Sequence, residues 1–242
     1  MNLYLLRVGA DTNFYSHMNE DRSYIFIPIP DDENSLITDL ARTYQNYTWN
    51  GIPVHNHLPE KILSRYIHDD PEFKTFTYGS PEFNTKGKTG RTEKNYRTLL
   101  QMQKGDILVF YAAFSRNVHN IEGYYFFAYF IIVDRAVNPN KLTNEEMDLV
   151  KGNHHFIHKC KLLPQNQVIV KGCPEQSRFL EKAVLLSSRE NDRGGGNYYP
   201  CQSVRQRLGG YCKSMNRSSI RGIDLPEKGI LQFKHYLDNN SV

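Results

Sequence analysis

The chain has few of the residues that would reveal its class at once. One tryptophan and four cysteines occur among 242 residues, and no two cysteines form a C-x-x-C pair. The cysteines stand at positions 160, 173, 201 and 212, a spacing that matches no common zinc site. The pattern predicts free thiols in a reducing compartment, and therefore a cytoplasmic protein.

Long hydrophobic runs are also missing. No apolar stretch approaches the roughly 18 residues of a membrane-spanning helix, and the N-terminus lacks the charged and apolar regions of a signal peptide. Mean hydropathy is −0.60. We therefore expect a soluble protein without a membrane partner, in which 16 tyrosines and 13 phenylalanines supply much of the apolar surface.

Motifs for cofactors and nucleophiles are absent as well. The glycines at 194–196 are not followed by G-K-[ST], and neither G-x-G-x-x-G nor G-x-S-x-G occurs. His154, His155 and His158 lack the glutamate of an H-E-x-x-H zinc motif. The sequence thus predicts neither a cofactor nor a metal site.

Charge is present but unevenly distributed. Residues 1–150 contain 15 Lys/Arg and 19 Asp/Glu, whereas residues 151–242 contain 15 and 7, a difference of +8 in the second part. Basic residues there alternate with tyrosines, which favours a groove for a nucleic-acid backbone. The residues concerned are Arg189, Arg193, Arg205, Arg207, Lys213, Arg217 and Arg221, with Tyr198, Tyr199 and Tyr211.

Apolar runs and turn signals predict an α+β fold with a mixed, strongly curved or barrel-like β-sheet and peripheral helices. We expect strands at 2–8, 24–30, 107–111, 123–135, 167–171 and 183–187, helices at 36–44, 94–103, 143–151 and 201–208, and a helical turn within 174–182. The tail beyond 210 has no clear pattern. No low-complexity linker divides the chain, so we expect one α+β domain, residues 1–187, with a basic C-terminal extension, 188–242, packed on it.

Several stretches of the sequence resemble a known family. LYLLRVGADT followed by FIPIP, the block HDDPEFKTFTYGSP, and the strand KGDILVFYA are similar to the nucleotide modification associated domain 3 family, and VIVKG and SRFLEKAVLLS fit its C-terminal half. The resemblance covers residues 1 to about 187. It implies a role with modified nucleic acid or nucleotides, and it carries no mechanism.

A second resemblance concerns the fold alone. A Gly-Asp turn, a strand running into Phe110-Tyr111 and a long aromatic strand are together similar to small β-barrels of the PUA, ASCH, EVE and YTH type. Such barrels often hold a base in an aromatic-lined pocket. This resemblance implies a pocket for a base beside the curved sheet.

The densest group of polar side chains falls between residues 66 and 78 and includes His68, Asp70, Glu72 and Tyr78. A base or sugar site needs a carboxylate, an imidazole that titrates near neutrality and an aromatic face, and this block supplies all three. As catalytic residues, Asp70 or Glu72 would act as general base and His68 as acid. The same residues also fit a structural loop, because Asp-Pro and Gly-Ser-Pro favour turns.

Other positions are candidates for nucleotide binding. Charged residues at a strand end or beside a glycine turn can reach a phosphate or a base edge, and a tyrosine at a strand end can stack. Salt bridges, turns and core packing remain open for the same residues. The candidates are Arg7, Asp11, Tyr78, Asp106, Tyr111, Lys171 and Arg178.

The chemistry therefore stays open between several functions. The protein either acts on a base or a modified base held in a pocket, or reads such a base without turnover. The tripeptide Glu72-Phe73-Lys74 also fits the E-x-K of metal-dependent nucleases that cut modified DNA. DNA or a nucleotide is the expected partner in each case, and an interaction protein without nucleic-acid affinity is the remaining alternative.

Overall fold

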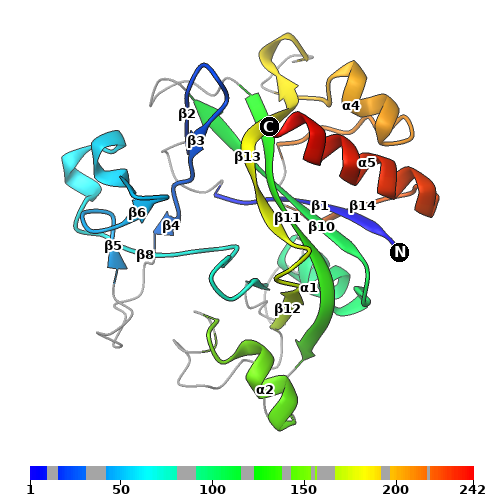
Figure 1. Ribbon diagram of the computed structural model, residues 1–242, viewed down its shortest axis with the longest axis horizontal. Helices are drawn as coiled ribbons and strands as arrows, with labels where there is room; N and C mark the ends of the chain where they lie inside the picture. Colours follow the sequence, from blue (N-terminus) through cyan, green and yellow to red (C-terminus); the bar gives the residue numbers. More distant parts are fainter. Residues whose placement is uncertain are drawn as a thin grey trace.

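The computed structural model describes residues 1–9, 16–30, 42–80, 91–115, 123–137, 143–153, 156, 167–191, 197–216 and 219–242. In that part of the chain one large mixed sheet contains nine strands, in the order β14-β1-β10-β11-β12-β9. In addition, β13 pairs with β11, β2 pairs with β10, and β3 pairs with β2. Figure 1 shows the sheet running through the middle of the molecule. Its strands are β1 (Leu3–Arg7), β2 (Ser16–Met18), β3 (Tyr24–Ile25), β9 (Thr77–Gly79), β10 (Ile107–Ser115), β11 (Gly123–Val137), β12 (Val168–Gly172), β13 (Arg178–Ser188) and β14 (Arg221–Ile223).

The length of β11 curls this sheet. One side of β11 pairs with β10, and the other pairs first with β13 and then with β12. Register shifts interrupt these ladders, one of them between Phe110 and Tyr111, and such bulges bend a strand and increase its twist. The result is a half-barrel, which confirms the predicted α+β fold with a strongly curved mixed sheet.

Both faces of the sheet are buried, because successive side chains of a strand point to opposite faces. Phe110 and Phe114 belong to one hydrophobic cluster, and Val109 and Tyr111 belong to the other. The second cluster is covered by α4 (Gln202–Arg207) and α5 (Glu227–Asn240), which lie together on one side of the sheet in Figure 1. Such double coverage explains the near-continuous apolar runs of the central strands.

The first cluster is covered by residues 16–30 and 42–80 and by α1 (Arg91–Gln101). Small sheets order this layer: β4 (Ile29–Pro30) and β5 (Arg42–Thr43) flank β8 (Tyr66–His68), and β6 (Thr48–Trp49) pairs with β7 (Ile52–Pro53). Short helices η2 (Val54–His57) and η3 (Glu60–Ile62) follow. The helices α2 (Asn144–Val150) and η5 (Arg189–Asn191) lie elsewhere in the chain.

Most of the expected elements are present, and some differ. The strand expected at 24–30 is split, since β3 and β4 belong to different sheets and Pro28 lacks the N–H that a continuous ladder needs. The helical turn expected at 174–182 is wrong beyond residue 177, because β13 begins at Arg178. The tail contains two elements with no counterpart among those expected, β14 and α5. Of the helix expected at 36–44, residues 36–41 lie outside the described residues, and the helix is wrong at Arg42 and Thr43, which form β5 paired with β8. Asp11, His154, His155 and His158 also lie outside the described residues.

The described residues contain neither a membrane-spanning helix nor a cluster of metal-ligating side chains. Their helices include none with the length and apolar character required to cross a membrane. Nor do these residues gather three or more His, Cys, Asp or Glu side chains where a metal ion could be held. The cysteines at 173, 201 and 212 are free thiols.

Candidate functional site

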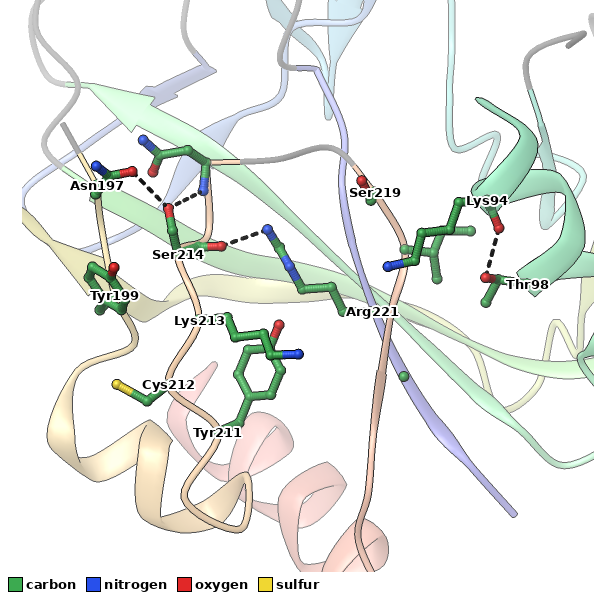
Figure 2. Close-up of a pocket in the computed structure, with 13 residues that line it drawn as sticks. Lys94, Thr98, Asn197, Tyr199, Tyr211, Cys212, Lys213, Ser214, Ser219 and Arg221 are labelled. Carbon is green, nitrogen blue, oxygen red and sulfur yellow. Dashed lines mark hydrogen bonds between the residues drawn. The ribbon is translucent and has the colours of Figure 1, made fainter. Parts of the chain in front are cut away.

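A cavity of about 680 Å³ opens at the edge of the sheet where β14 lies. Helix α1 forms one wall, and residues 197–199 and 211–216 form the other, with β14 between them (Figure 2). Its volume falls within the range of small-molecule sites. The described lining contains three basic side chains, Lys94, Lys213 and Arg221; two tyrosines, Tyr199 and Tyr211; the hydroxyls of Thr98, Ser214 and Ser219; the amides of Asn197 and Asn216; and also Cys212, Ile220 and Gly222.

Strand pairing brings two arginines and a tyrosine together behind this cavity. Arg7 on β1 is in register with Tyr111 on β10, and Arg221 on β14 is in register with Leu5 on β1. The guanidinium of Arg221 donates to the phenol oxygen of Tyr111 and, at 2.6 Å, to the carbonyl of Ser214. The Tyr111 hydroxyl donates in turn to the carbonyl of Met215 at 3.1 Å.

Arg7 lies behind the cavity wall rather than in it. Its guanidinium donates to the carbonyl of Asn216, a lining residue, and its charge lies 4.9 Å from the ring centre of Tyr124. Burial raises the pKa of the Tyr111 phenol, and the guanidiniums of Arg221 and Arg7 oppose that rise. The positive charges of both arginines therefore act on the same phenol, behind the cavity wall.

Within the described part of the chain, the positive charge of this site has no anionic counterpart. No aspartate or glutamate occurs among the described lining residues, and no described carboxylate forms an ion pair with Arg7 or Arg221. Arg221 is only 9% exposed. Because a buried charge without an ionic partner is costly, this arrangement favours an incoming anion.

One hydroxyl in the cavity is likewise unmatched. The phenol oxygen of Tyr211 is buried and makes no hydrogen bond with the described residues, as is also true of the Nε of Arg7. Figure 2 shows the Tyr211 hydroxyl pointing from the ring toward Arg221. Burial raises the pKa of Tyr211, and Arg221 opposes the rise, so the phenol stays a neutral hydrogen-bond donor. Buried polar groups are normally paired, so an unpaired one beside a cavity calls for a partner such as a bound ligand.

The residues predicted around position 70 form a separate cluster near the other edge of the sheet. Burial, Glu72 and Asp69 raise the pKa of the half-buried Asp70 carboxyl well above its usual value. Glu72 is 9% exposed and accepts a hydrogen bond from Thr75 at 3.2 Å. The Nζ of Lys171 donates to the carbonyl of Thr75. Burial lowers the pKa of Lys171, and Glu72 opposes this.

This cluster is built on a tight turn. Glu72 and Thr77 pair through both backbone hydrogen bonds, at 2.9 and 3.0 Å, and Thr77 continues into β9, where it is in register with Lys171. Glu72 and Lys74, the outer residues of the E-x-K tripeptide, therefore lie on a turn and not on a continuous strand. Of His68 we describe only the backbone, which pairs with Ile29.

The remaining predicted residues are distributed over the molecule. Tyr78 is buried in the first core cluster, 5.7 Å from the ring of Phe110. Asp106 is 1% exposed, and its two oxygens accept hydrogen bonds from the backbone N–H groups of Asn2, at 2.7 Å, and Gln103, at 3.0 Å. Arg178 lies 3.6 Å from Asp238 on α5.

The structure thus brings together only part of the predicted set. Arg7 and Tyr111 lie behind the cavity wall, in contact with the lining residues Asn216 and Arg221. Asp70, Glu72 and Lys171 share the second cluster, and Asp106, Tyr78 and Arg178 lie apart from both. The cavity instead gathers four residues of the basic and aromatic C-terminal series, namely Lys213, Arg221, Tyr199 and Tyr211. The sequence did not predict Lys94 and Asn216 as cavity residues, because they meet there only through a contact between segments far apart in sequence.

Comparison with known proteins gives one match. The family model described as nucleotide modification associated domain 3 matches residues 2–206, which is most of the chain. The chain belongs to this family. No curated protein and no solved structure shows significant similarity to it. Membership in this family supports a role associated with nucleotide modification. The matched segment ends at residue 206, before the cavity residues at 211–222.

Proposed function

We propose that this nucleotide modification associated protein binds a phosphate-bearing nucleotide in the cavity between α1 and residues 197–222. The observation that carries the proposal is Arg221, a buried guanidinium beside the unpaired hydroxyl of Tyr211, in a cavity whose described lining holds no carboxylate. Arginine and hydroxyl donors are the usual partners of phosphate oxygens. Family membership supports a nucleotide as the source of that phosphate.

The cavity offers each part of a nucleotide a suitable surface. In the proposed complex the phosphate accepts hydrogen bonds from Arg221 and from the Tyr211 hydroxyl, while Arg7 adds positive charge from behind the wall. The half-buried ring of Tyr199 provides a face for stacking a base. The amide of Asn197 and the hydroxyls of Thr98 and Ser219 can pair with base or sugar edges.

Titration calorimetry with one nucleoside and its 5′-monophosphate tests this proposal. We expect the monophosphate to bind and the nucleoside to bind at least tenfold more weakly, with an affinity that falls as salt rises. Tyr211→Phe removes a hydroxyl without a partner among the described residues. It should therefore weaken binding of the monophosphate about tenfold, the loss of one hydrogen bond to a charged group. Tyr66→Phe, at an exposed position of β8, is the matched control. Equal binding of nucleoside and monophosphate would contradict the proposal.

Cysteine reactivity gives an independent reading of occupancy. Cys212 lines the cavity, whereas Cys173 and Cys201 do not. A bound nucleotide should slow alkylation of Cys212 by iodoacetamide and leave the alkylation rates of Cys173 and Cys201 unchanged. Peptide mass spectrometry follows these rates. Uniform protection, or none at saturating nucleotide, would argue against this location.

A second candidate function concerns catalysis at the Asp70 cluster. The favouring observation is the pKa of Asp70, which burial and the neighbouring Glu72 raise well above its usual value, since catalytic carboxyls are commonly tuned upward in this way. In that version Asp70, Glu72 and His68 act on a base or a glycosidic bond, as the sequence suggests. Asp70→Asn combined with Glu72→Gln should then abolish turnover and spare binding.

The alternative without turnover is a reader of modified bases. Mass analysis of modified and unmodified DNA, and of the corresponding nucleotides, after incubation with the protein separates the two versions. A reader prefers the modified form and leaves every mass unchanged, and a metal-dependent nuclease shortens the DNA in the presence of Mg²⁺.

A further inference from the structure

The positive charge of the cavity is arranged in two tiers. Arg221, 9% exposed, forms the inner tier with Arg7 behind it. Lys94 and Lys213 form the outer tier, and both are exposed. They come from opposite walls, Lys94 from α1 and Lys213 from the segment after α4, and Figure 2 shows both side chains at the cavity.

Neither lysine is neutralised by the described residues around it. No described carboxylate forms an ion pair with Lys94 or Lys213, and Glu93, beside Lys94 on α1, pairs instead with Arg97 at 2.6 Å. A phosphate monoester carries about −1.5 to −2 charges at neutral pH, which the inner tier alone can match. The outer tier is therefore available for a second anionic group.

The inner tier closes the cavity behind it. Tyr111 is fully buried against Arg221, and Tyr124, 2% exposed, packs beneath Arg7. Because these buried rings pack behind the two arginines, a phosphate group that reaches Arg221 fits best as the end of its molecule. A phosphodiester within a nucleic-acid strand continues in both directions, so this geometry disfavours an internal position of DNA or RNA and favours a terminal phosphate.

We infer that the ligand is a free nucleoside di- or triphosphate, whose terminal phosphate lies at Arg221 and Tyr211 and whose preceding phosphate lies between Lys94 and Lys213. This inference rests on the proposed function and makes it more specific. It assigns the two arginines and two lysines to a chain of phosphates, and leaves the ring of Tyr199, which also lines the cavity, for the nucleoside. It also makes the protein one that engages the nucleotide before or apart from its incorporation in a strand.

Calorimetry with the mono-, di- and triphosphate of a single nucleoside, and with a 5′-phosphorylated oligonucleotide ending in that nucleoside, tests the inference. Wild-type protein should bind the diphosphate about tenfold more tightly than the monophosphate, and more tightly than the oligonucleotide. The double variant Lys94→Gln, Lys213→Gln should retain monophosphate affinity within about threefold and lose most of the gain from the second phosphate. Lys228→Gln, which removes an exposed lysine of α5 away from the cavity, is the matched control.

The possible failures are distinct. If no nucleotide binds to the wild-type protein, the proposed function fails. If the mono- and diphosphate bind equally, or the oligonucleotide binds more tightly than the diphosphate, the cavity binds phosphate but the inference is overturned. A double variant that keeps the full diphosphate gain would overturn the assignment of the two lysines.

Discussion

Arg221 and Tyr111 lie 110 residues apart in sequence, and the guanidinium of one donates a hydrogen bond to the phenol oxygen of the other. This contact joins the edge strand β14 to the central strand β10 across β1. The contact also distinguishes Tyr111 from the neighbouring Tyr211. Tyr111 is fully paired with protein atoms, whereas the Tyr211 hydroxyl has no partner among the described residues.

The two tyrosines should respond differently to loss of the hydroxyl. Tyr111→Phe removes the acceptor for Arg221 and the donor to Met215, so we expect a loss of about 1–3 kcal/mol in the free energy of unfolding. Tyr211→Phe should change this free energy by less than about 0.5 kcal/mol. Urea unfolding followed by circular dichroism measures both, and similar losses in the two variants would contradict the assignment.

Asp238 on α5 connects this helix to strands β11 and β13 of the sheet. Its carboxylate accepts a hydrogen bond from Tyr129 on β11 at 2.8 Å and from Lys234 at 2.9 Å, and lies 3.6 Å from Arg178. Asp238→Asn should cost about 1–2 kcal/mol of stability, because a charged acceptor is replaced by a neutral amide. Arg178→Gln should cost less than about 1 kcal/mol, since that side chain is 55% exposed. Thermal and urea unfolding test this order, and an equal effect of the two changes would contradict it.

The raised pKa of Asp70 makes a prediction about pH. A carboxyl whose pKa is higher in the folded state than in the unfolded state resists ionisation on folding, so it destabilises the fold once the pH exceeds its unfolded value of about 3.9. Asp70→Asn should therefore stabilise the protein at pH 7, and the gain should shrink as pH falls toward 4. Urea unfolding between pH 4 and 8 measures the gain. Asp148→Asn, on the exposed face of α2, is the control, and a gain independent of pH would count against the burial of Asp70 as its cause.

Two strand glycines should differ in their tolerance of a methyl group. A Cβ on Gly123 would stand 2.2 Å from the carbonyl oxygen of Ser187 on the neighbouring strand, whereas a Cβ on Gly222 meets nothing closer than 3.7 Å. We expect Gly123→Ala to cost about 1–3 kcal/mol by overpacking and Gly222→Ala to be tolerated. The midpoints of urea unfolding of the two variants and the wild-type protein measure this difference. A Gly123→Ala protein as stable as the wild type would contradict the close approach of Gly123 to Ser187.

The sequence allowed the central strands to be predicted because β1, β10 and β11 are apolar runs long enough to exceed chance. The first half of β13 was missed because Arg178, Glu181 and Lys182 interrupt its apolar pattern. Helix α5 did carry a signal, since Ile230, Phe233 and Leu237 follow helical spacing after Pro226. Strand β14 has three residues and owes its place to β1, which no local pattern reveals.

The candidate site was predictable in composition but not in position. The mixture of arginines, lysines and tyrosines after residue 188 indicated a phosphate-bearing partner, and four of these residues line the cavity. The opposite wall could not be foreseen, because Lys94 reaches it through the packing of α1 beside residues 219–221. Asn95, its neighbour on α1, accepts a hydrogen bond from the N–H of Ile220 at 2.7 Å.

Strand β14 lies at the edge of the large sheet, whereas the strands that form its centre lie elsewhere in the chain. Eight of the nine strands of the large sheet lie within the segment matched by the family, whereas Tyr211, Lys213 and the strand β14 with Arg221 follow it. An edge strand can change its side chains without disturbing two neighbours at once. Exchanging residues 207–226 between members of the family should therefore transfer ligand preference while the half-barrel stays intact, which makes this segment the natural target for redesign.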